Sequence, residues 1–213
     1  MKKTATLLLA FLFIGLHLNA QHKHDYQWLM GHPPASFYGL FSMNFNDSLH
    51  FEEVDTQMEM SNFQTSICDD EGRLIFYTNG CWIANAEHEM MAHGDSLNFG
   101  DDYWSTFNYN TLCEDGNGSG GIWDGPYYHY AQVVQRPDSE DQYFMFHYRN
   151  SRIDDFSAFD LLQYTRIDMS LENGLGRVVE KNVPILDDTL IHQQVNMCKH
   201  ANGRDWWLLS WKR

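Results

Sequence analysis

The stretch Ile67-Cys-Asp-Asp-Glu-Gly-Arg-Leu-Ile-Phe-Tyr-Thr-Asn-Gly80 decides the fold of this chain. It begins with an apolar pair, runs through a turn at Asp69–Gly72 and continues as the apolar run Leu74–Thr78. Two short apolar segments on either side of an acidic turn that contains glycine are typical of a β-hairpin. The stretch therefore predicts two antiparallel strands joined at Asp69–Gly72.

The second of these strands has apolar residues on both faces. In simple alternation, Leu74, Phe76 and Thr78 face one way, whereas Ile75 and Tyr77 face the other. A simple sandwich usually leaves one face of a strand polar. We therefore expect stacked sheets that cover this strand on both sides.

Two later stretches have the same order of strand, polar turn and apolar strand. They are Val133–Tyr148 and Met197–Trp211, and the three turns lie roughly 65 residues apart, enough for a four-stranded blade and a long loop. In the third stretch, Asn202-Gly203 predicts a two-residue type I′ turn. Short strands with turn residues between them continue along the chain, without strong helical periodicity. The sequence predicts an all-β fold, an incomplete β-propeller of about two and a half to three four-stranded blades.

The expected organisation is a leader, a short arm and one repeat domain. Residues 1–20 are expected to be a signal peptide, 21–36 an N-terminal arm and 37–213 a partial β-propeller. Its blades are expected at residues 37–98, 128–186 and 187–213, with a long insertion at 99–127 and a polar loop at 150–159. A propeller closes with about four to eight blades, so these units are too few for closure.

The first 20 residues have the pattern of a secretory signal peptide. Lys2 and Lys3 precede the apolar run Leu7–Leu16, which is too short to span a bilayer. Removal of this leader leaves 12 basic against 29 acidic residues, a formal charge of −17. That charge repels nucleic acids and anionic membrane surfaces, whereas cations and neutral glycans stay compatible as partners. We expect a secreted protein, in the periplasm, at the cell surface or outside the cell, with no membrane span after leader removal.

The cysteines Cys68, Cys81, Cys113 and Cys198 would all meet the oxidising environment of an exported protein. Four cysteines allow three pairings, between which the sequence does not choose. Cys68 and Cys81 flank the opening hairpin, but an extended strand separates them by roughly 23 Å, so a bridge between them would need the chain to fold back. No pair has the C-x-x-C spacing of a structural zinc site.

The glycine-rich part of the insertion has the spacing of a calcium-binding loop. Asp115, Asn117 and Ser119 place oxygen donors at alternate positions, and a glycine follows them. Pro126 stands where such a loop has its bidentate acid, and Asp124 is the nearest substitute. The two interpretations are weak calcium binding at Asp115, Asn117 and Ser119 and a flexible loop without a metal. No other cofactor is indicated.

The segment His88-Glu-Met-Met-Ala-His93 resembles a zinc protease motif but is one residue too long. On a helix its two histidines would lie about 140° apart, so they would not bind one zinc ion from the same face. Aromatic residues of the insertion could stack on sugars or anchor the loop in the core; these are Tyr103, Trp104, Trp123, Tyr127 and Tyr128. No nucleophile elbow, phosphate loop or dinucleotide fingerprint is present, and no catalytic residue is assigned.

Several motifs, in the same order, resemble the N-terminal propeller-like (WD40-like) region of large secreted proteins from Bacteroidota. The motifs are Asp70–Gly80, Met90–Leu97, Ile167–Met169, Gly174–Asn182 and His200–Trp207. In that family the propeller continues for several more blades and commonly ends in a C-terminal sorting domain of the type IX secretion system. Both are missing here, so the resemblance implies a truncated member of the family.

The sequence thus predicts a non-enzymatic binding or scaffold module at the cell envelope, with an extracellular glycan or protein as its ligand. One alternative is part of a glycan-active or lactone-active propeller hydrolase whose catalytic residues lie partly in further blades. Another is a truncated product without a function.

Overall fold

The structure is a computed structural model of the 213-residue chain, and it describes residues 23–31, 39–56, 58, 60, 65–98, 106–107, 110–111, 131–153, 156–190 and 195–210. The predicted signal peptide lies outside these residues. So do most of the predicted insertion at 99–127, the calcium-loop candidates Asp115, Asn117 and Ser119, and the five aromatic residues that could stack on sugars or anchor the loop.

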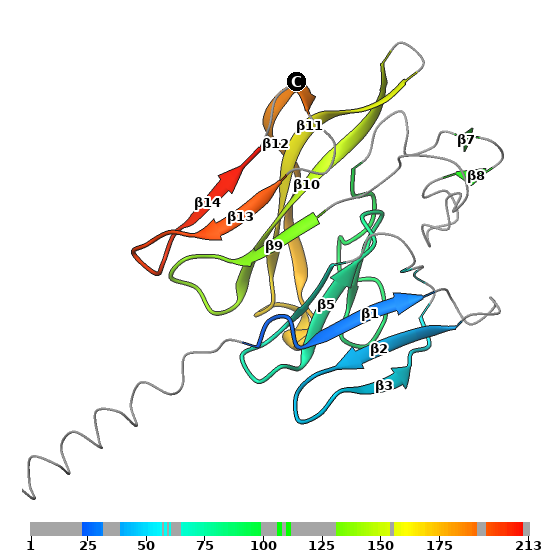
Figure 1. Ribbon diagram of the computed structural model, residues 1–213, viewed down its shortest axis with the longest axis vertical. Helices are drawn as coiled ribbons and strands as arrows, with labels where there is room; N and C mark the ends of the chain where they lie inside the picture. The colour runs from blue at the N-terminus through cyan, green and yellow to red at the C-terminus, as the bar shows by residue number, and fades with distance from the viewer. Residues whose placement is uncertain are drawn as a thin grey trace, which may run out of the picture.

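The fold is all-β and consists of several small antiparallel sheets, none of which closes on itself within the described residues (Figure 1). The first sheet contains β1 (Gln27–Gly31), β2 (Leu40–Asn44) and β3 (His50–Glu53), and the middle sheet contains β4 (Thr65–Cys68), β5 (Leu74–Thr78) and β6 (Ile83–Asn85). The long sheet contains β9 (Ala131–Gln135), β10 (Gln142–Ile153), β11 (Phe156–Asp168) and β12 (Arg177–Leu190). The end hairpin contains β13 (Asn196–Lys199) and β14 (Trp206–Leu209), and β7 (Thr106–Phe107) pairs with β8 (Asn110–Thr111). A short 3₁₀ turn, η2 (Glu172–Gly174), precedes β12.

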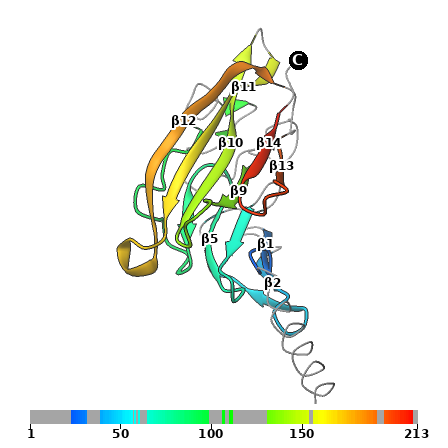
Figure 2. The same ribbon diagram turned by 90° about the vertical axis from the view of Figure 1, so that its left-hand side faces the viewer.

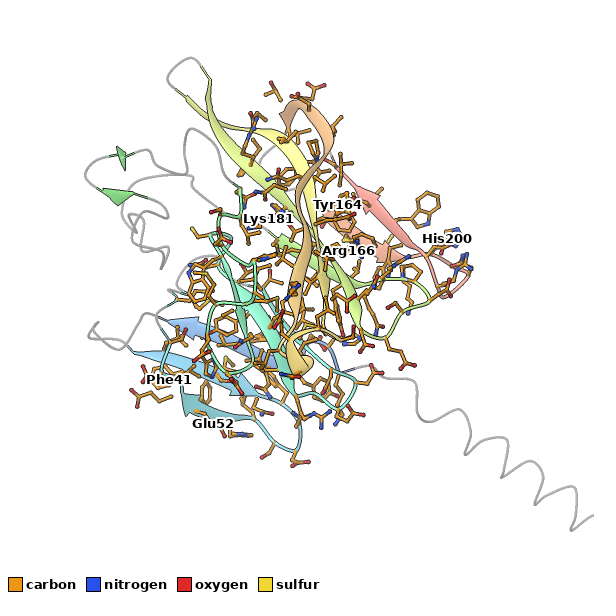
Figure 3. All side chains as sticks on the ribbon, turned by 180° about the vertical axis from the view of Figure 1, so that it is seen from behind. Phe41, Glu52, Tyr164, Arg166, Lys181 and His200 are labelled. Atoms are coloured by element: carbon orange, nitrogen blue, oxygen red, sulfur yellow. The ribbon has the colours of Figure 1, made fainter. Side chains whose placement is uncertain are left out.

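The sheets stack face to face in chain order through three separate apolar cores. The first core joins the first and middle sheets and includes Leu29, Leu40 and Tyr77. A second core joins the middle and long sheets, and a third joins the long sheet to the end hairpin. Figure 3 accordingly shows Phe41 and Glu52 of the first sheet far from His200 in the end hairpin.

Strand β5 is covered on both faces, as the sequence predicts. Tyr77 packs into the first core and Phe76 into the second, and both side chains are fully buried. The predicted alternation is wrong at its start, however, because Leu74 packs with Tyr77 and Ile75 packs with Phe76. A register shift against β4 is the cause: Cys68 pairs with Leu74 and Ile67 pairs with Phe76, so Ile75 is an extra, bulged residue.

The polar loop predicted at 150–159 is wrong. Strands β10 and β11 continue through this segment and pair up to Ile153 and Phe156, with a register shift after Arg149. Figure 2 shows this long hairpin extending past the shorter β9. Backbone pairing in a hairpin needs no apolar side chains, so a polar composition did not prevent strand formation here.

The N-terminal arm predicted at 21–36 is wrong over its central part, because Gln27–Gly31 form β1 and pair with β2. Leu29 is the residue that attaches this strand, since its side chain is fully buried in the first core. A single buried leucine in a polar, histidine-rich segment is a weak strand signal, which explains the error.

The turn of the end hairpin also differs from the predicted two-residue type I′ turn. Its loop spans His200–Asp205 and is closed by bonds from the Gly203 amide to the His200 carbonyl (2.9 Å) and from the His200 amide to the Asp205 carbonyl (2.7 Å). Gly203 has φ +74°, whereas Asn202 keeps a negative φ, so one left-handed residue is enough for this turn.

The described cysteines differ in oxidation state and in burial. Cys81 is disulfide-bonded, whereas Cys68 is a buried free thiol and Cys198 an exposed one. A Cys68–Cys81 bridge is therefore absent, in agreement with the separation expected along the strand.

Within the described residues, the chain has no helix of the length and apolarity needed to cross a bilayer.

Candidate functional site

The hairpin turns of three stacked sheets meet at one edge of the molecule and enclose two adjoining cavities. The larger, of about 840 Å³, lies between the β9–β10 turn and the end hairpin. The smaller, of about 390 Å³, lies between the β9–β10 turn and the Asp69 turn that joins β4 to β5. Both cavities are lined by His24, Gln135, Glu140, Asp141 and Tyr143, so together they form one groove, called here the turn groove.

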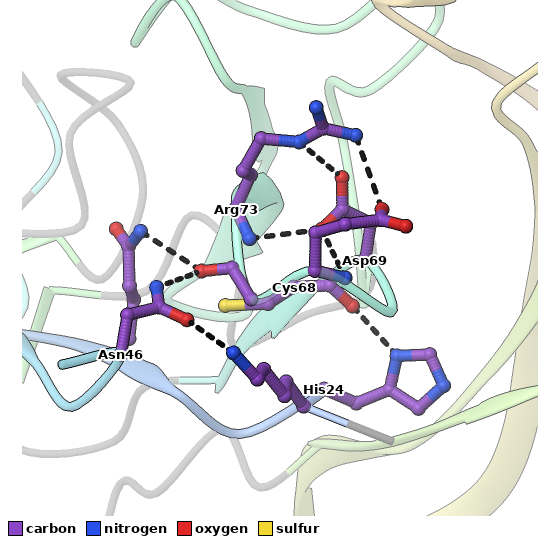
Figure 4. A network of polar contacts seen from close by, with 9 residues as sticks. His24, Asn46, Cys68, Asp69 and Arg73 are labelled. Atoms are coloured by element: carbon purple, nitrogen blue, oxygen red, sulfur yellow. Dashed lines mark hydrogen bonds and ion pairs between the residues drawn. The ribbon is translucent and has the colours of Figure 1, made fainter. Parts of the chain in front are cut away.

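The Asp69 turn is held by the carboxylate of its first residue (Figure 4). Asp69 Oδ1 accepts hydrogen bonds from the amides of Glu71 (3.0 Å) and Arg73 (2.9 Å), and Oδ2 accepts one from the Arg73 guanidinium (2.7 Å). Arg73 also reaches Glu71 at 3.2 Å. Aspartate is favoured at this position because its short side chain can bond backbone amides two and four residues further on. The same bonds fix the acidic turn beside the smaller cavity.

Residues in and around the first sheet hold this turn by hydrogen bonds to its backbone carbonyls. The amide groups of Asn46 and Gln27 donate to the Gly72 carbonyl at 2.8 and 3.1 Å. His24 Nδ1 donates to the Cys68 carbonyl at 2.7 Å, which leaves its Nε2 facing Asp70 at 3.5 Å. Gly72 is required here because its φ is +82° and a Cβ atom would lie 2.2 Å from Asn46 Oδ1.

The β9–β10 turn supplies two carboxylates, of Glu140 and Asp141, that have no partner among the described residues. The Ser139 amide donates to the Arg136 carbonyl at 3.2 Å, and Asp138 takes the left-handed conformation with φ +62°. Glu140 and Asp141 follow, and both are exposed to solvent. Their backbone carbonyls accept hydrogen bonds, but their carboxylates form no hydrogen bond or ion pair with any described residue.

Tyr143 lies at the floor of the turn groove, where it lines both cavities. Its ring packs edge-on against Phe76 with centroids 5.6 Å apart, and only 3% of the residue is exposed. Its hydroxyl makes no hydrogen bond to any described residue. Burial, reinforced by the negative charges of Asp70, Asp69 and Asp141, raises the pKa of Tyr143 to about 12. The phenol is thus neutral, and the carboxylates of Asp69, Asp70 and Asp141 are close enough to add to the shift.

The wall of the larger cavity is aromatic and carries positive charge. Trp206 lines it, and Lys199 Nζ lies over the tryptophan ring, 5.6 Å from the centroid. Arg204 pairs with Asp205 at 2.9 Å and approaches Asp138 at 3.8 Å. A tryptophan face beside paired charges suits a ligand that has apolar as well as polar groups.

Four buried polar residues form a hydrogen-bonded network between the middle and long sheets, away from the turn groove. Asn98 Nδ2 donates to the Gly80 carbonyl at 3.0 Å, so its Oδ1 accepts from His147 Nδ1 (2.6 Å) and Gln163 (2.9 Å). His147 Nε2 in turn contacts the Thr165 hydroxyl at 2.9 Å. Because its groups satisfy one another, this network serves packing rather than ligand binding.

The two histidines of the His88–His93 segment and the buried Cys68 lie in surroundings that give them structural roles. His88 has φ +64°, and its Nδ1 lies 3.1 Å from the Tyr77 hydroxyl; burial lowers the pKa of His88. His93 also has a positive φ, of 59°, and lies in a turn rather than on a helix. Burial raises the pKa of the Cys68 thiol to about 11, so this cysteine is not a nucleophile near neutral pH.

Sequence reasoning missed the turn groove, although it placed the turns that form it. The three similar stretches predict equivalent turns, and repeats that stack in register bring equivalent turns to one edge. That inference would have pointed to Glu140, Asp141 and Gly203 together. The sequence does not show that Tyr143 and Trp206 border a cavity.

Comparison with known proteins adds no relatives: no family model, no curated protein and no solved structure matches this chain.

Proposed function

We propose that the protein is a secreted binding module that takes an extracellular ligand into the turn groove. The groove itself carries this proposal: turns from three sheets enclose two adjoining cavities, of about 840 and 390 Å³, with an aromatic wall, a buried tyrosine and unused carboxylates. Such a combination of apolar surface with a few directed polar groups is typical of ligand sites.

Four carboxylates outside the groove have structural roles. Hydrogen bonds and ion pairs lower the pKa of Asp95, Asp168, Glu180 and Asp205; the leading bond partners are Lys181, Ser170, Arg166 and Arg204 respectively. A general acid needs the opposite shift, toward the working pH. The proposal of a glycan-active or lactone-active hydrolase is therefore not supported by these four groups.

The proposed location outside the cytoplasm rests on two observations. The basic start and short apolar run of residues 1–20 have the pattern of a signal peptide. In addition, Cys81 is disulfide-bonded, which is typical of oxidising compartments such as the periplasm or the extracellular space.

The proposal extends to the architecture, in which the sheets are blades of a β-propeller of the Bacteroidota type. Support comes from the long sheet, a four-stranded antiparallel meander in the order β12-β11-β10-β9, and from its face-to-face packing between two neighbours in chain order. Blades of propellers are meanders of this kind. As a propeller module at the cell envelope, the chain would present the turn groove as its ligand site.

Adjacent tryptophans on β14 allow a matched test of the binding function. Trp206 lines the groove, whereas Trp207 points to the opposite face and is 55% exposed. The purified protein and its Trp206→Ala and Trp207→Ala variants would be screened against arrays of glycans and peptides. We expect ligands that bind the wild type and Trp207→Ala but not Trp206→Ala. Equal binding by both variants, or turnover of a glycan or lactone by the wild type, would contradict the proposal.

A further inference from the structure

The described residues that line the smaller cavity of the turn groove include five carboxylates and one arginine. Asp69, Asp70 and Glu71 enter it from one side, and Glu140 and Asp141 enter it from the other. Its arginine, Arg73, is already bonded to Asp69 and Glu71. The carboxylates of Glu140 and Asp141, which have no partner among the described residues, can therefore attract a positive group from a ligand.

Tyr143 gives an independent indication of a ligand at the same place. The residue is 97% buried and lines the cavity, and its hydroxyl oxygen, which is not itself fully buried, has no hydrogen-bond partner among the described residues. A tyrosine with a buried ring usually places its hydroxyl against a polar partner. A group that enters the cavity would supply one, and a positively charged donor would be favoured by the carboxylates that surround the phenol.

The shape of the cavity suits a charged group on an aliphatic stem better than a bare metal ion. In the described part of the chain, no three carboxylate, imidazole or thiol groups converge as metal ligands must. Instead, Ile75 and Met169 line the cavity beside the acidic residues. Lysine and arginine side chains combine a methylene stem with a cationic head, and they place the stem on apolar surface.

The larger cavity continues from the smaller one and gives room for neighbouring residues of a chain. It shares Tyr143, Glu140 and Asp141 with the smaller cavity and adds the aromatic surface of Trp206. A free cation would leave this surface unused, whereas an extended peptide would place an apolar side chain there. From these contacts we infer that the turn groove binds an extended polypeptide segment through a lysine or arginine in the Glu140–Asp141 cavity and an adjacent apolar residue at Trp206.

This inference rests on the proposed binding function, and its test separates the two. The probe is a fluorescein-labelled, N-acetylated hexapeptide with one arginine between two leucines, and its neutral counterpart has citrulline in place of arginine. Fluorescence anisotropy with the purified protein should show about tenfold tighter binding of the arginine peptide at low salt. Equal affinity for the two peptides would overturn the inference.

Variants of the groove locate the binding. Glu140→Gln with Asp141→Asn removes two charges with little change of shape, and we expect it to weaken binding of the arginine peptide about tenfold. Glu52→Gln with Glu53→Gln removes the same charge from the exposed strand β3 of the first sheet and should leave binding within about twofold. Tyr143→Phe keeps the ring but loses the hydroxyl and should weaken binding about fivefold. Equal losses in the Glu140/Asp141 and Glu52/Glu53 variants would overturn the inference, since they would reflect net charge alone.

A control with neutral ligands distinguishes the inference from the broader proposal. If a neutral glycan binds in a way that Trp206→Ala abolishes, while neither hexapeptide binds, the polypeptide class is wrong and the binding function stands. If the arginine peptide binds and responds to the groove variants as described, both are supported.

Discussion

Strand β5 of the middle sheet and strand β14 of the end hairpin have similar apolar sequences but different surroundings. β5 lies between two strands of its own sheet and between two apolar cores. β14 has one partner strand, and only one of its faces is covered: Leu208 packs against the long sheet, whereas Trp207 and Leu209 are about half exposed. The comparison shows that an apolar run on both faces does not by itself establish that both faces are buried. Whether both faces of such a strand are buried depends on where its sheet lies in the stack.

The largest expected difference between the two strands concerns core truncation. Phe76→Ala removes a fully buried ring from the second core and should lower the free energy of unfolding by about 3–5 kcal/mol. Trp207→Ala removes an exposed ring and should change it by less than about 1 kcal/mol. Urea denaturation followed by circular dichroism measures both. Similar losses for the two variants would show that β14 is as deeply buried as β5.

The same comparison can be made for polar side chains, with the buried Asn98 and the exposed Asn202. Asn98→Ala would leave His147 and Gln163 without their shared acceptor and should cost about 2–3 kcal/mol of unfolding free energy. Asn202→Ala removes two bonds to backbone amides in the exposed turn of the end hairpin and should cost about 0.5–1 kcal/mol. Thermal unfolding of both variants tests the order. An Asn98 variant as stable as the wild type would mean that the network contributes no stability.

Two turn glycines form the next matched pair. Gly72 and Gly203 both have positive φ, +82° and +74°, so alanine is strained by about 1 kcal/mol at either position. At Gly72 the new Cβ would also displace the Asn46 side chain, whereas at Gly203 nothing lies within 4 Å. Gly72→Ala should therefore destabilise the protein by about 1 kcal/mol more than Gly203→Ala. The difference in urea midpoint between the two variants is the measurement, and the reverse order would contradict the placement of Asn46.

The smallest expected effect is a pH dependence of the free energy of unfolding, which arises at the contact between the middle and long sheets. Lys181 donates to Asp95 at 3.0 Å, and this bond is the main cause that lowers the pKa of Asp95 from its ordinary value of 3.8. A carboxylate whose pKa is lower in the folded state stabilises the fold above pH 3.8, and this stabilisation is lost as the pH falls through the folded value.

Because Asp95 is exposed, the Lys181–Asp95 bond should contribute less than about 0.5 kcal/mol to the free energy of unfolding. Lys181→Met should abolish it, which denaturation curves at pH 6 and pH 3 would show as a smaller acid-induced loss of stability than in the wild type. An unchanged loss would mean that the bond does not contribute.

The sequence was sufficient for the strand class and for the positions of the three similar turns, because both follow from local patterns. The acidic turn before Leu74 and the doubly apolar β5 are examples. It was insufficient where backbone pairing overrides composition, as in the polar part of β10 and β11, and where one extra residue shifts the register, as at Ile75. Most of the groove could not be predicted, because residues about 60 positions apart come together only through the stacking of sheets.

Hydrogen exchange tests the stacked arrangement most directly, since it reports the stability of each strand in the intact protein. If the middle sheet is covered on both faces and the end hairpin on one, amides of β5 should exchange only through global unfolding. Those of β14 should exchange at least about tenfold faster through local opening. Equal protection of β5 and β14, or faster exchange in β5, would contradict the account.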